Sequence, residues 1–325
     1  MAFRIAPALA AVTAAAGLCA LAAAQPVQTQ YPRVYGINYN PYIESTNSLL
    51  HQVGGWNNPA TTNTLYITDM ASCSHGIVRY RMNTQVMVDE FPQKNDGYRY
   101  DDATYLDCLA TWSGWHSPDG VDYKQITRNF DLARRVDFGE IDEVFIQGAP
   151  YFGYWESTMA GYGGYFCNSS PQQRIPASRI FIMMGFNYER GIGEMLEDYG
   201  HRSESILRVA YGSWQVAETH AWNRFTLYDK VMPGKAACGN VHFAPNSQSD
   251  YDWGNTTYVW STHNDWLNNY PNLTGDKEWV NSAAWGNGDI RLHHLWWFAR
   301  FPHVEGSLVD HGGMVRLNNW WEYTQ

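Results

Sequence analysis

Four side chains able to bind a metal ion recur at intervals of three and four residues between positions 194 and 204. They are Glu194, Glu197, His201 and Glu204, and in a helix this spacing brings them onto one face. Histidine nitrogens and carboxylate oxygens are common ligands of divalent metal ions. Glu197 and His201, with His242 further along the chain, would therefore suit a metal-dependent hydrolase.

The apolar residues of the same segment favour a different interpretation. At 100° per residue they gather on the opposite side of the helix; they are Ile192, Met195, Leu196, Tyr199, Ile206 and Leu207. The Glu/His face is then expected to point into solvent. We therefore predict no cofactor or metal, and keep a divalent metal ion at Glu197 and His201 as the alternative.

Carboxylates also follow several predicted strands. Glu44, Glu156 and Glu189 each come shortly after a strand, and open parallel sheets bind ligands outside the carboxyl ends of their strands. Glycoside cleavage needs two carboxyl groups, roughly 5–5.5 Å apart for retention or 6.5–9.5 Å for inversion. The preferred prediction is an extracellular carbohydrate-active hydrolase that draws its acid and base from these three residues.

Amides, aromatic rings and a histidine at the same strand ends are expected to bind the substrate, a polysaccharide or oligosaccharide. These residues are Asn40, Tyr154, Trp155, Asn187, Tyr188, Arg190, His242, Asn246, Asp252 and Trp253. Two of them also suit structural roles, because Asn187 could cap the following helix and Asp252 could close an Asx turn.

An alternating series of strands and helices is expected to position these residues. Strands are predicted near residues 34–40, 75–82, 144–146, 179–186 and 238–243, and helices near 43–53, 61–70, 123–136, 192–208, 214–231 and 290–300. Asp101 or Asp102 and Asp289 are predicted helix caps. This order predicts an α/β fold: a single domain with a mostly parallel sheet flanked by helices, long aromatic-rich loops and an irregular C-terminal third.

The first 24 residues have the pattern of a signal peptide. Arg4 precedes an Ala/Leu/Val-rich core, and small residues precede Gln25. We therefore expect residues 25–325 to form one secreted or periplasmic domain with no membrane association after cleavage. Four cysteines remain in this part, Cys73, Cys108, Cys167 and Cys238, and an even number in an exported chain suggests disulfides.

Composition bears on the choice of ligand. The formal net charge of −10 argues against nucleic acid, which is bound mainly by basic patches. Aromatic residues make up 15% of the chain. Their rings can stack on sugar faces, which also allows a non-catalytic secreted glycan-binding protein, or they can simply fill a large core.

Four strings resemble segments of a functionally uncharacterised family of secreted, largely bacterial proteins. They are IDEVFIQGAPYFGYWES, GFNYERGIGEMLEDYGHRSES, HFAPNSQSDYDWGN and NNWWEY. The resemblance implies one recurring extracellular domain that covers most of the chain after the signal, and it transfers no catalytic residue.

Overall fold

Five strands of the described part of the chain form the central sheet, in the order β4-β1-β5-β7-β6. The computed structural model describes residues 27–325. Within it β1 (Arg33–Tyr39), β4 (Arg81–Val88), β5 (Glu143–Gly148) and β7 (Phe181–Asn187) run parallel, while β6 (Ser157–Ala160) pairs antiparallel with β7 at one edge. The predicted α/β fold with a mostly parallel sheet is confirmed.

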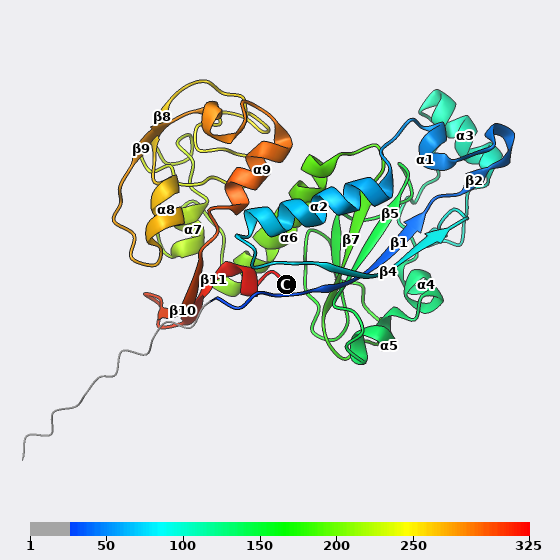
Figure 1. Ribbon diagram of the computed structural model, residues 1–325, viewed down its shortest axis with the longest axis horizontal. Helices are drawn as coiled ribbons and strands as arrows, with labels where there is room; N and C mark the ends of the chain where they lie inside the picture. The colour runs from blue at the N-terminus through cyan, green and yellow to red at the C-terminus, as the bar shows by residue number, and fades with distance from the viewer. Residues whose placement is uncertain (1–26) are drawn as a thin grey trace, which may run out of the picture.

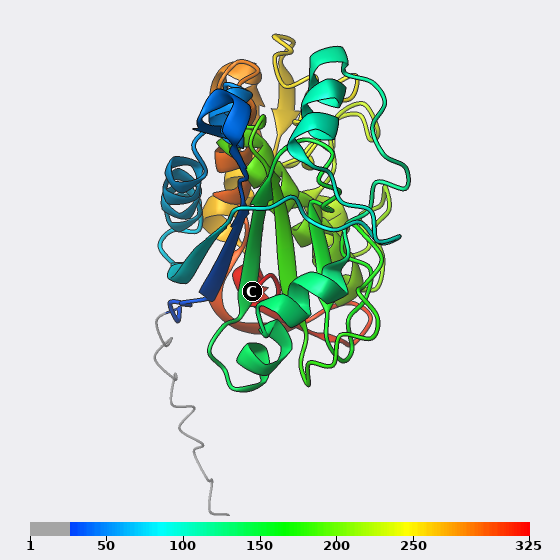
Figure 2. The ribbon, with the colours of Figure 1, turned by 90° about the vertical axis from the view of Figure 1, so that its right-hand side faces the viewer.

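Helices cover both faces of this sheet (Figures 1 and 2). Helices α2 (Pro59–Cys73) and α6 (Ile192–Tyr211) pack on one face, against side chains such as Phe145. Helices α3 (Asp102–Thr111), α4 (Tyr123–Asn129) and α5 (Leu132–Asp137) share a second core with Val144 and Ile146, from the other face. Every residue of β5 is buried, as expected for a strand covered on both sides.

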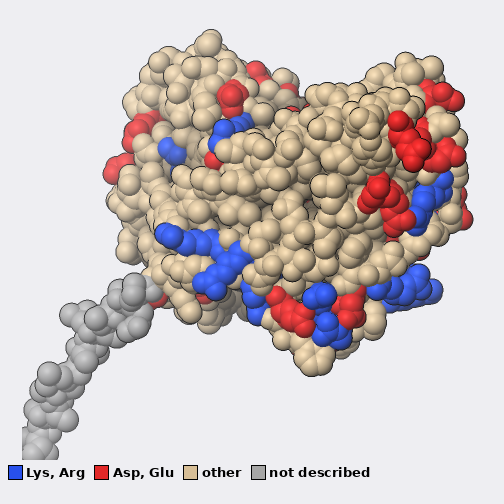
Figure 3. Space-filling model, turned by 45° about the vertical axis from the view of Figure 1, so that its right-hand side comes forward, with Lys and Arg blue, Asp and Glu red and all other residues tan. Residues whose placement is uncertain are grey.

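The C-terminal third packs against the outer side of α6 and forms the left-hand lobe of Figure 1. Its elements are α7 (Ala221–Phe225), β8 (Val259–Ser261), α8 (His263–Asn269), β9 (Glu278–Val280), α9 (Ile290–Phe298), β10 (His303–Val309) and β11 (Val315–Asn319). Gly193 permits the close approach of α9, because a Cβ there would lie 2.4 Å from Ile290 Cγ2. Figure 3 shows that the outline of the molecule is indented between this C-terminal lobe and the lobe that contains the central sheet.

Short elements complete the chain. They are β2 (Tyr42–Ile43), β3 (Ser48–Leu49), α1 (Leu50–Val53) and the 3₁₀ turns η1 (Glu44–Thr46), η2 (Ser282–Trp285) and η3 (Trp320–Glu322). Many aromatic rings do fill the core: Trp222, Trp285, Trp297, Trp320 and Trp321 are fully buried. Part of the aromatic composition is therefore structural.

Several element predictions are wrong. The strand expected at 238–243 is a series of turns, because the backbone of Gly239 has φ +72° and Asn240 and Phe243 bond to each other. The strand expected at 75–82 forms only from Arg81, and the helix expected at 214–231 shrinks to α7. Strand β6 was missed because its polar Ser157 and Thr158 resemble loop residues, although both are buried and hydrogen-bonded to the 167–172 segment.

The predicted helix at 123–136 is divided in two, because Asp131 adopts a left-handed conformation with φ +53°. The segment expected to be helical at 43–53 instead forms η1, the β2–β3 pair and the short α1. The predicted caps Asp101 and Asp289 are confirmed, since each side chain accepts a hydrogen bond from the first turn of its helix.

All four cysteines of the described chain are free and buried, so the expected disulfides are not present. Each thiol lies among core side chains: Cys73, Cys167 and Cys238 belong to the core that includes α6, and Cys108 to the core of α3. Burial raises the pKa of the Cys73 and Cys238 thiols. The signal-peptide prediction for residues 1–24 lies outside the described residues. No helix within 27–325 is long and apolar enough to cross a membrane.

The start of α2 allows a test of local stability. Asn58 Oδ1 accepts hydrogen bonds from the backbone N–H groups of Ala60 (3.0 Å) and Thr61 (3.2 Å). The substitution Asn58→Ala should lower the free energy of unfolding by about 1 kcal/mol, measured by urea denaturation. Thr64→Ala, at an exposed site on the same helix, is the control; an equal loss in both variants would contradict the capping role.

Candidate functional site

A polar cleft of about 340 Å³ lies at the carboxyl ends of β5 and β7. Its lining includes Asp119, Tyr151, Tyr154, Glu156, Asn187, Arg190, Glu194, Glu197, Asp198 and Tyr251. Residues from the ends of two parallel strands, from α6 and from the C-terminal third therefore meet here. Binding sites of open α/β sheets occupy this edge, so the cleft is the candidate active site.

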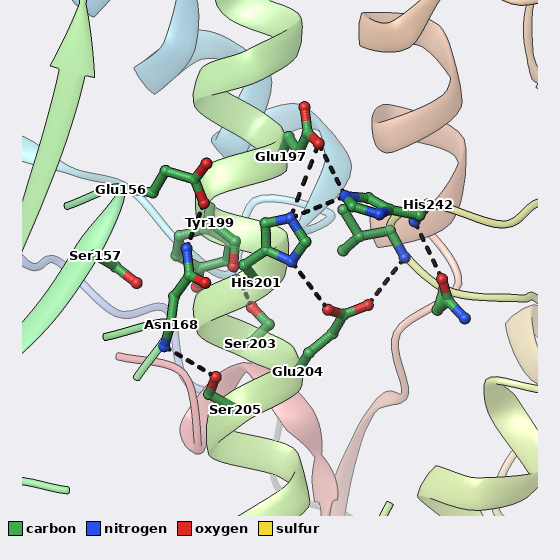
Figure 4. Close-up of polar contacts among 12 residues, drawn as sticks. Glu156, Ser157, Asn168, Glu197, Tyr199, His201, Ser203, Glu204, Ser205 and His242 are labelled. Carbon is green, nitrogen blue, oxygen red and sulfur yellow. Dashed lines mark hydrogen bonds and ion pairs between the residues drawn. The ribbon is translucent and has the colours of Figure 1, made fainter. Parts of the chain in front are cut away.

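Three potential metal ligands converge where α6 meets the C-terminal third (Figure 4). We call Glu197, His201 and His242 the Glu/His cluster; their ligand atoms all lie within 4.8 Å of one another. His242 Nε2 is 3.1 Å from both Glu197 Oε1 and His201 Nε2. Glu197 also lines the cleft, so the cluster connects directly with it.

Carboxylates hold the outer nitrogen of both imidazole rings. His201 Nδ1 is 3.2 Å from Glu204 Oε2, and His242 Nδ1 is 2.9 Å from Asp250 Oδ1. A carboxylate on Nδ1 fixes the tautomer that leaves Nε2 as a lone-pair acceptor. Two such Nε2 atoms and a carboxylate oxygen then face one another, and positive charge, either a proton on His201 or a divalent cation between the three atoms, stabilises this arrangement. One shared proton can bridge two of these atoms, whereas a divalent cation satisfies all three.

The pKa shifts of the cluster follow from the same contacts. Burial lowers the pKa of His201, but hydrogen bonds to Glu197 and Glu204 outweigh it and raise the value to about 10. The pKa of His242 is likewise raised, chiefly by Glu197 against the effect of burial. Burial opposes the charge on Glu197, but bonds to His201, His242 and Tyr251 lower its pKa. The cluster as a whole favours bound positive charge.

Gly200 is the local reason that His242 reaches α6. A Cβ at this glycine would lie 2.5 Å from Val241 Cγ2, so only glycine lets the 239–243 turn lie directly on the helix. Glu204 Oε1 accepts the Val241 N–H at 3.0 Å and fastens the turn there. The expectation that the Glu/His face points into solvent is wrong, since Glu197 and Glu204 are both buried beneath the C-terminal third.

Tyr251 closes the cluster on the side of the cleft. Its hydroxyl donates to Glu197 Oε1 at 2.8 Å and lies 3.1 Å from His242 Nε2. The ring is half-exposed and lines the cleft. This hydroxyl is therefore a hydrogen-bond donor placed between the cluster and any ligand in the cleft.

Two further carboxyl groups line the cleft beside the cluster. Glu156 lies just before β6, where Asn168 Nδ2 donates to its Oε2 (Figure 4). Asp198 is only 9% exposed, and its carboxyl group has no hydrogen-bond or ion-pair partner among residues 27–325. Burial, followed by repulsion from Glu156 and Glu197, raises the pKa of Asp198 well above its usual value.

A buried lysine holds the far wall of the cleft. Lys94 Nζ donates to Asp119 Oδ1 and to the Tyr151 carbonyl, both at 2.5 Å. Tyr151 is stacked on Trp115 with ring centroids 4.0 Å apart. The loop after β5 is therefore rigidly placed, although its sequence is rich in glycine.

Only part of the predicted site lies in the cleft. Tyr154, Glu156, Asn187 and Arg190 line it, and His242 belongs to the cluster. Glu44 lies in η1 and Glu189 is exposed, and neither lines the cleft. The structure thus brings only one of the three predicted catalytic carboxylates to it.

The other predicted binding residues have contacts that stabilise the fold. Asn40 bonds to His51, Tyr188 donates to Asn38 and to the Tyr39 carbonyl, and Asn246 donates to two carbonyls. Asp252 accepts hydrogen bonds from Gln248 N and Asn255 Nδ2 within a turn, and the ring of Trp253 stacks on His293. Trp155, in contrast, is exposed and does not line the cleft. Asn187 does not cap α6, whose N-cap is Gly191.

Sequence reasoning missed Asp119, Asp198 and Tyr251. Asp198 sits one residue after Glu197 and does not share the three- and four-residue spacing of the cluster. Asp119 and Tyr251 lie in loops, where position along the chain does not predict contact with α6. A glycine inside the α6 pattern, Gly200, was the one signal of a close approach at this point.

Comparisons with known proteins returned nothing: no family model, no curated protein and no solved structure matches this chain. The site is therefore interpreted from its own geometry.

Proposed function

We propose that this protein is a metal-dependent hydrolase in which the Glu/His cluster binds one divalent cation, best matched by zinc. Two histidine nitrogens and one carboxylate form a common ligand set of catalytic zinc, with a further position left for water or substrate. The observation that carries the proposal is that both Nε2 atoms face Glu197 at 3.1 Å and 3.8 Å while carboxylates hold both Nδ1 atoms.

The cleft favours a neutral or cationic substrate. Five acidic residues line it, and Arg190 is the one basic residue of the lining within 27–325; the acidic residues are Asp119, Glu156, Glu194, Glu197 and Asp198. Such a surface repels phosphate esters and other anions. An amide or ester carbonyl suits it better, because a bound metal ion polarises a carbonyl and activates water.

Two chain residues beside the Glu/His cluster have defined roles in this proposal. A divalent cation held by Glu197, His201 and His242 would polarise the carbonyl and lower the pKa of water, and Glu156 would take the proton from the water that attacks the carbonyl carbon. The Tyr251 hydroxyl donates to Glu197 Oε1 in this structure; once Glu197 bound the cation, the hydroxyl would turn to donate a hydrogen bond to the oxyanion that forms. Glu156 then returns the proton to the leaving nitrogen or oxygen as its bond to carbon breaks, so one water yields an acid and an amine or alcohol.

A panel of peptide, simple ester and acetylated-glycan substrates tests this proposal, assayed before and after chelation. Turnover should disappear with the chelator and return with added Zn²⁺. Tyr251→Phe should retain the metal but lose about 10²-fold in kcat, while Tyr162→Phe, a substitution at an exposed site outside the cleft, should not. Activity that persists in chelator with no bound metal would refute the proposal.

A second candidate is a carbohydrate-active hydrolase that uses carboxylates alone. The observation in its favour is that Glu156 and the unpaired Asp198 line the same cleft. In this candidate the acid–base pair consists of Glu156 and Asp198, and the predicted carboxylates Glu44 and Glu189 take no part. Metal-independent glycoside cleavage, lost in both Glu156→Gln and Asp198→Asn, would select this candidate over the first.

A further inference from the structure

Three aromatic rings are exposed together on the small antiparallel strand pair β8–β9, outside the cleft. Trp260 and Trp279 are directly opposite each other across the two strands, and Tyr258 immediately precedes β8. Their exposed fractions are 53%, 54% and 47%. We call these three residues the aromatic platform.

The three rings pack against one another. The rings of Tyr258 and Trp279 are stacked in nearly parallel planes, with an interplanar angle of 9° and centroids 5.8 Å apart. Trp260 is tilted by 54° from Trp279 at 5.2 Å. Two parallel rings and a third ring tilted beside them form an exposed apolar surface.

Folding alone does not account for this exposure. The residues that alternate with these rings along β8 and β9 are buried, so it is the other face of the strand pair that packs on the core. They are Val259, Ser261 and Val280. Outward residues of such a pair are normally polar, and a cross-strand ring pair contributes only about 0.2–1 kcal/mol. A patch of exposed rings in this position indicates a binding surface.

Hydrogen bonds to neighbouring loops fix the position of the β8–β9 strand pair and therefore of its rings. Ser261 Oγ donates to the Ala237 carbonyl at 2.7 Å, and Thr262 N donates to the Ala236 carbonyl at 3.0 Å. Asn246 donates to the carbonyls of Asn255 and Thr257, which fixes the approach to Tyr258. A pre-organised surface loses little conformational entropy on binding.

We propose that the aromatic platform binds the pyranose rings of a polysaccharide. Sugar rings present C–H faces that stack on aromatic rings, and their hydroxyls need polar partners at the edge. Stacking on the three rings carries the proposal, because Glu278, beside Trp279 in β9, pairs with Ser261 and so projects from the opposite face, where it accepts two hydrogen bonds from Asn264 Nδ2, both at 2.9 Å.

The size and charge of the surface favour this occupant over two others. Three half-exposed rings offer roughly 300 Å², well below the ~800 Å² per partner of a stable protein interface. The formal net charge of −10 opposes adsorption to an anionic lipid surface. A polysaccharide needs neither a large area nor basic residues.

Retention of the full chain on three insoluble polysaccharides, cellulose, chitin and xylan, tests the proposal. The wild type should bind at least one of them. The double variant Trp260→Ala/Trp279→Ala should weaken that binding by about tenfold or more. Phe138→Ala, which removes a ring that is 74% exposed on the opposite lobe, should leave binding unchanged, and circular dichroism checks that all variants are folded.

The platform is independent of the Glu/His cluster, so binding should persist in chelator and in a His201→Ala variant. Equal binding by the folded double variant and the wild type would overturn the proposal. So would the absence of wild-type retention on all three materials, or a change of oligomeric state as the only effect of the double substitution.

Discussion

His201→Ala should abolish stoichiometric metal binding and reduce turnover to background. The substitution removes one of three converging ligands and leaves Glu197 and His242 to share a single cation. Loss of a protein ligand from a three-ligand site removes the geometry that holds the ion with an open position. Metal content by elemental analysis and kcat/KM on the best substrate of the panel are the two measurements.

Matched variants separate ligand loss from general damage. Glu204→Gln keeps a hydrogen-bond acceptor near His201 Nδ1 but removes its charge, so metal affinity should fall by about 10–100-fold rather than vanish. His311→Ala, at an exposed position on the β10–β11 turn, should retain both metal and activity. Wild-type metal content in folded His201→Ala would contradict the assignment of His201 as a ligand.

Arg202→Met should destabilise the protein by about 3–5 kcal/mol. Arg202 is 1% exposed, and its guanidinium bonds to Glu143 Oε1 and, at 2.6 Å, to the Thr324 carbonyl. Removing it leaves Glu143 buried without its counter-ion. Burial already holds the pKa of Glu143 above its usual value, against the opposing effect of Arg202, so the variant must bury an uncompensated charge or take up a proton.

Urea denaturation followed by tryptophan fluorescence measures this loss. Arg202→Met/Glu143→Leu removes both charges and should recover most of the stability. Lys235→Ala breaks an ion pair with Glu218 in which both side chains are about half exposed, and should cost less than about 1 kcal/mol. A loss below that level in Arg202→Met would show that the buried pair does not anchor α6 to β5.

The sheet could be predicted because its signals are local. Continuous apolar runs in β5 and β7, followed by helices, indicate buried parallel strands whatever lies elsewhere in the chain. The rule that ligands bind at the carboxyl ends of strands then singled out Glu156, Asn187 and Arg190, which do line the cleft. What failed was the choice among polar residues in the following loops, because a loop residue such as Glu44 can follow a strand and still turn away.

The Glu/His cluster could not be assigned from helical phasing alone. The spacing of Glu197 and His201 correctly placed them on one face of α6, and the apolar residues do pack on the sheet. Phasing says nothing about a second layer, and here the C-terminal third covers the polar face. Irregular turns such as 239–243 carry no periodic signal, so the position of His242 against His201 follows only from tertiary packing at Gly200.

Zinc K-edge X-ray absorption spectroscopy on the purified protein, reconstituted with one equivalent of Zn²⁺, tests the central claim most directly. We expect two imidazole nitrogens and one carboxylate oxygen at about 2.0–2.2 Å, with a further light-atom ligand from water. The histidine contribution should fall by half in His242→Ala. A spectrum of hexa-aqua zinc, or one unchanged by that substitution, would show that the Glu/His cluster is not a metal site.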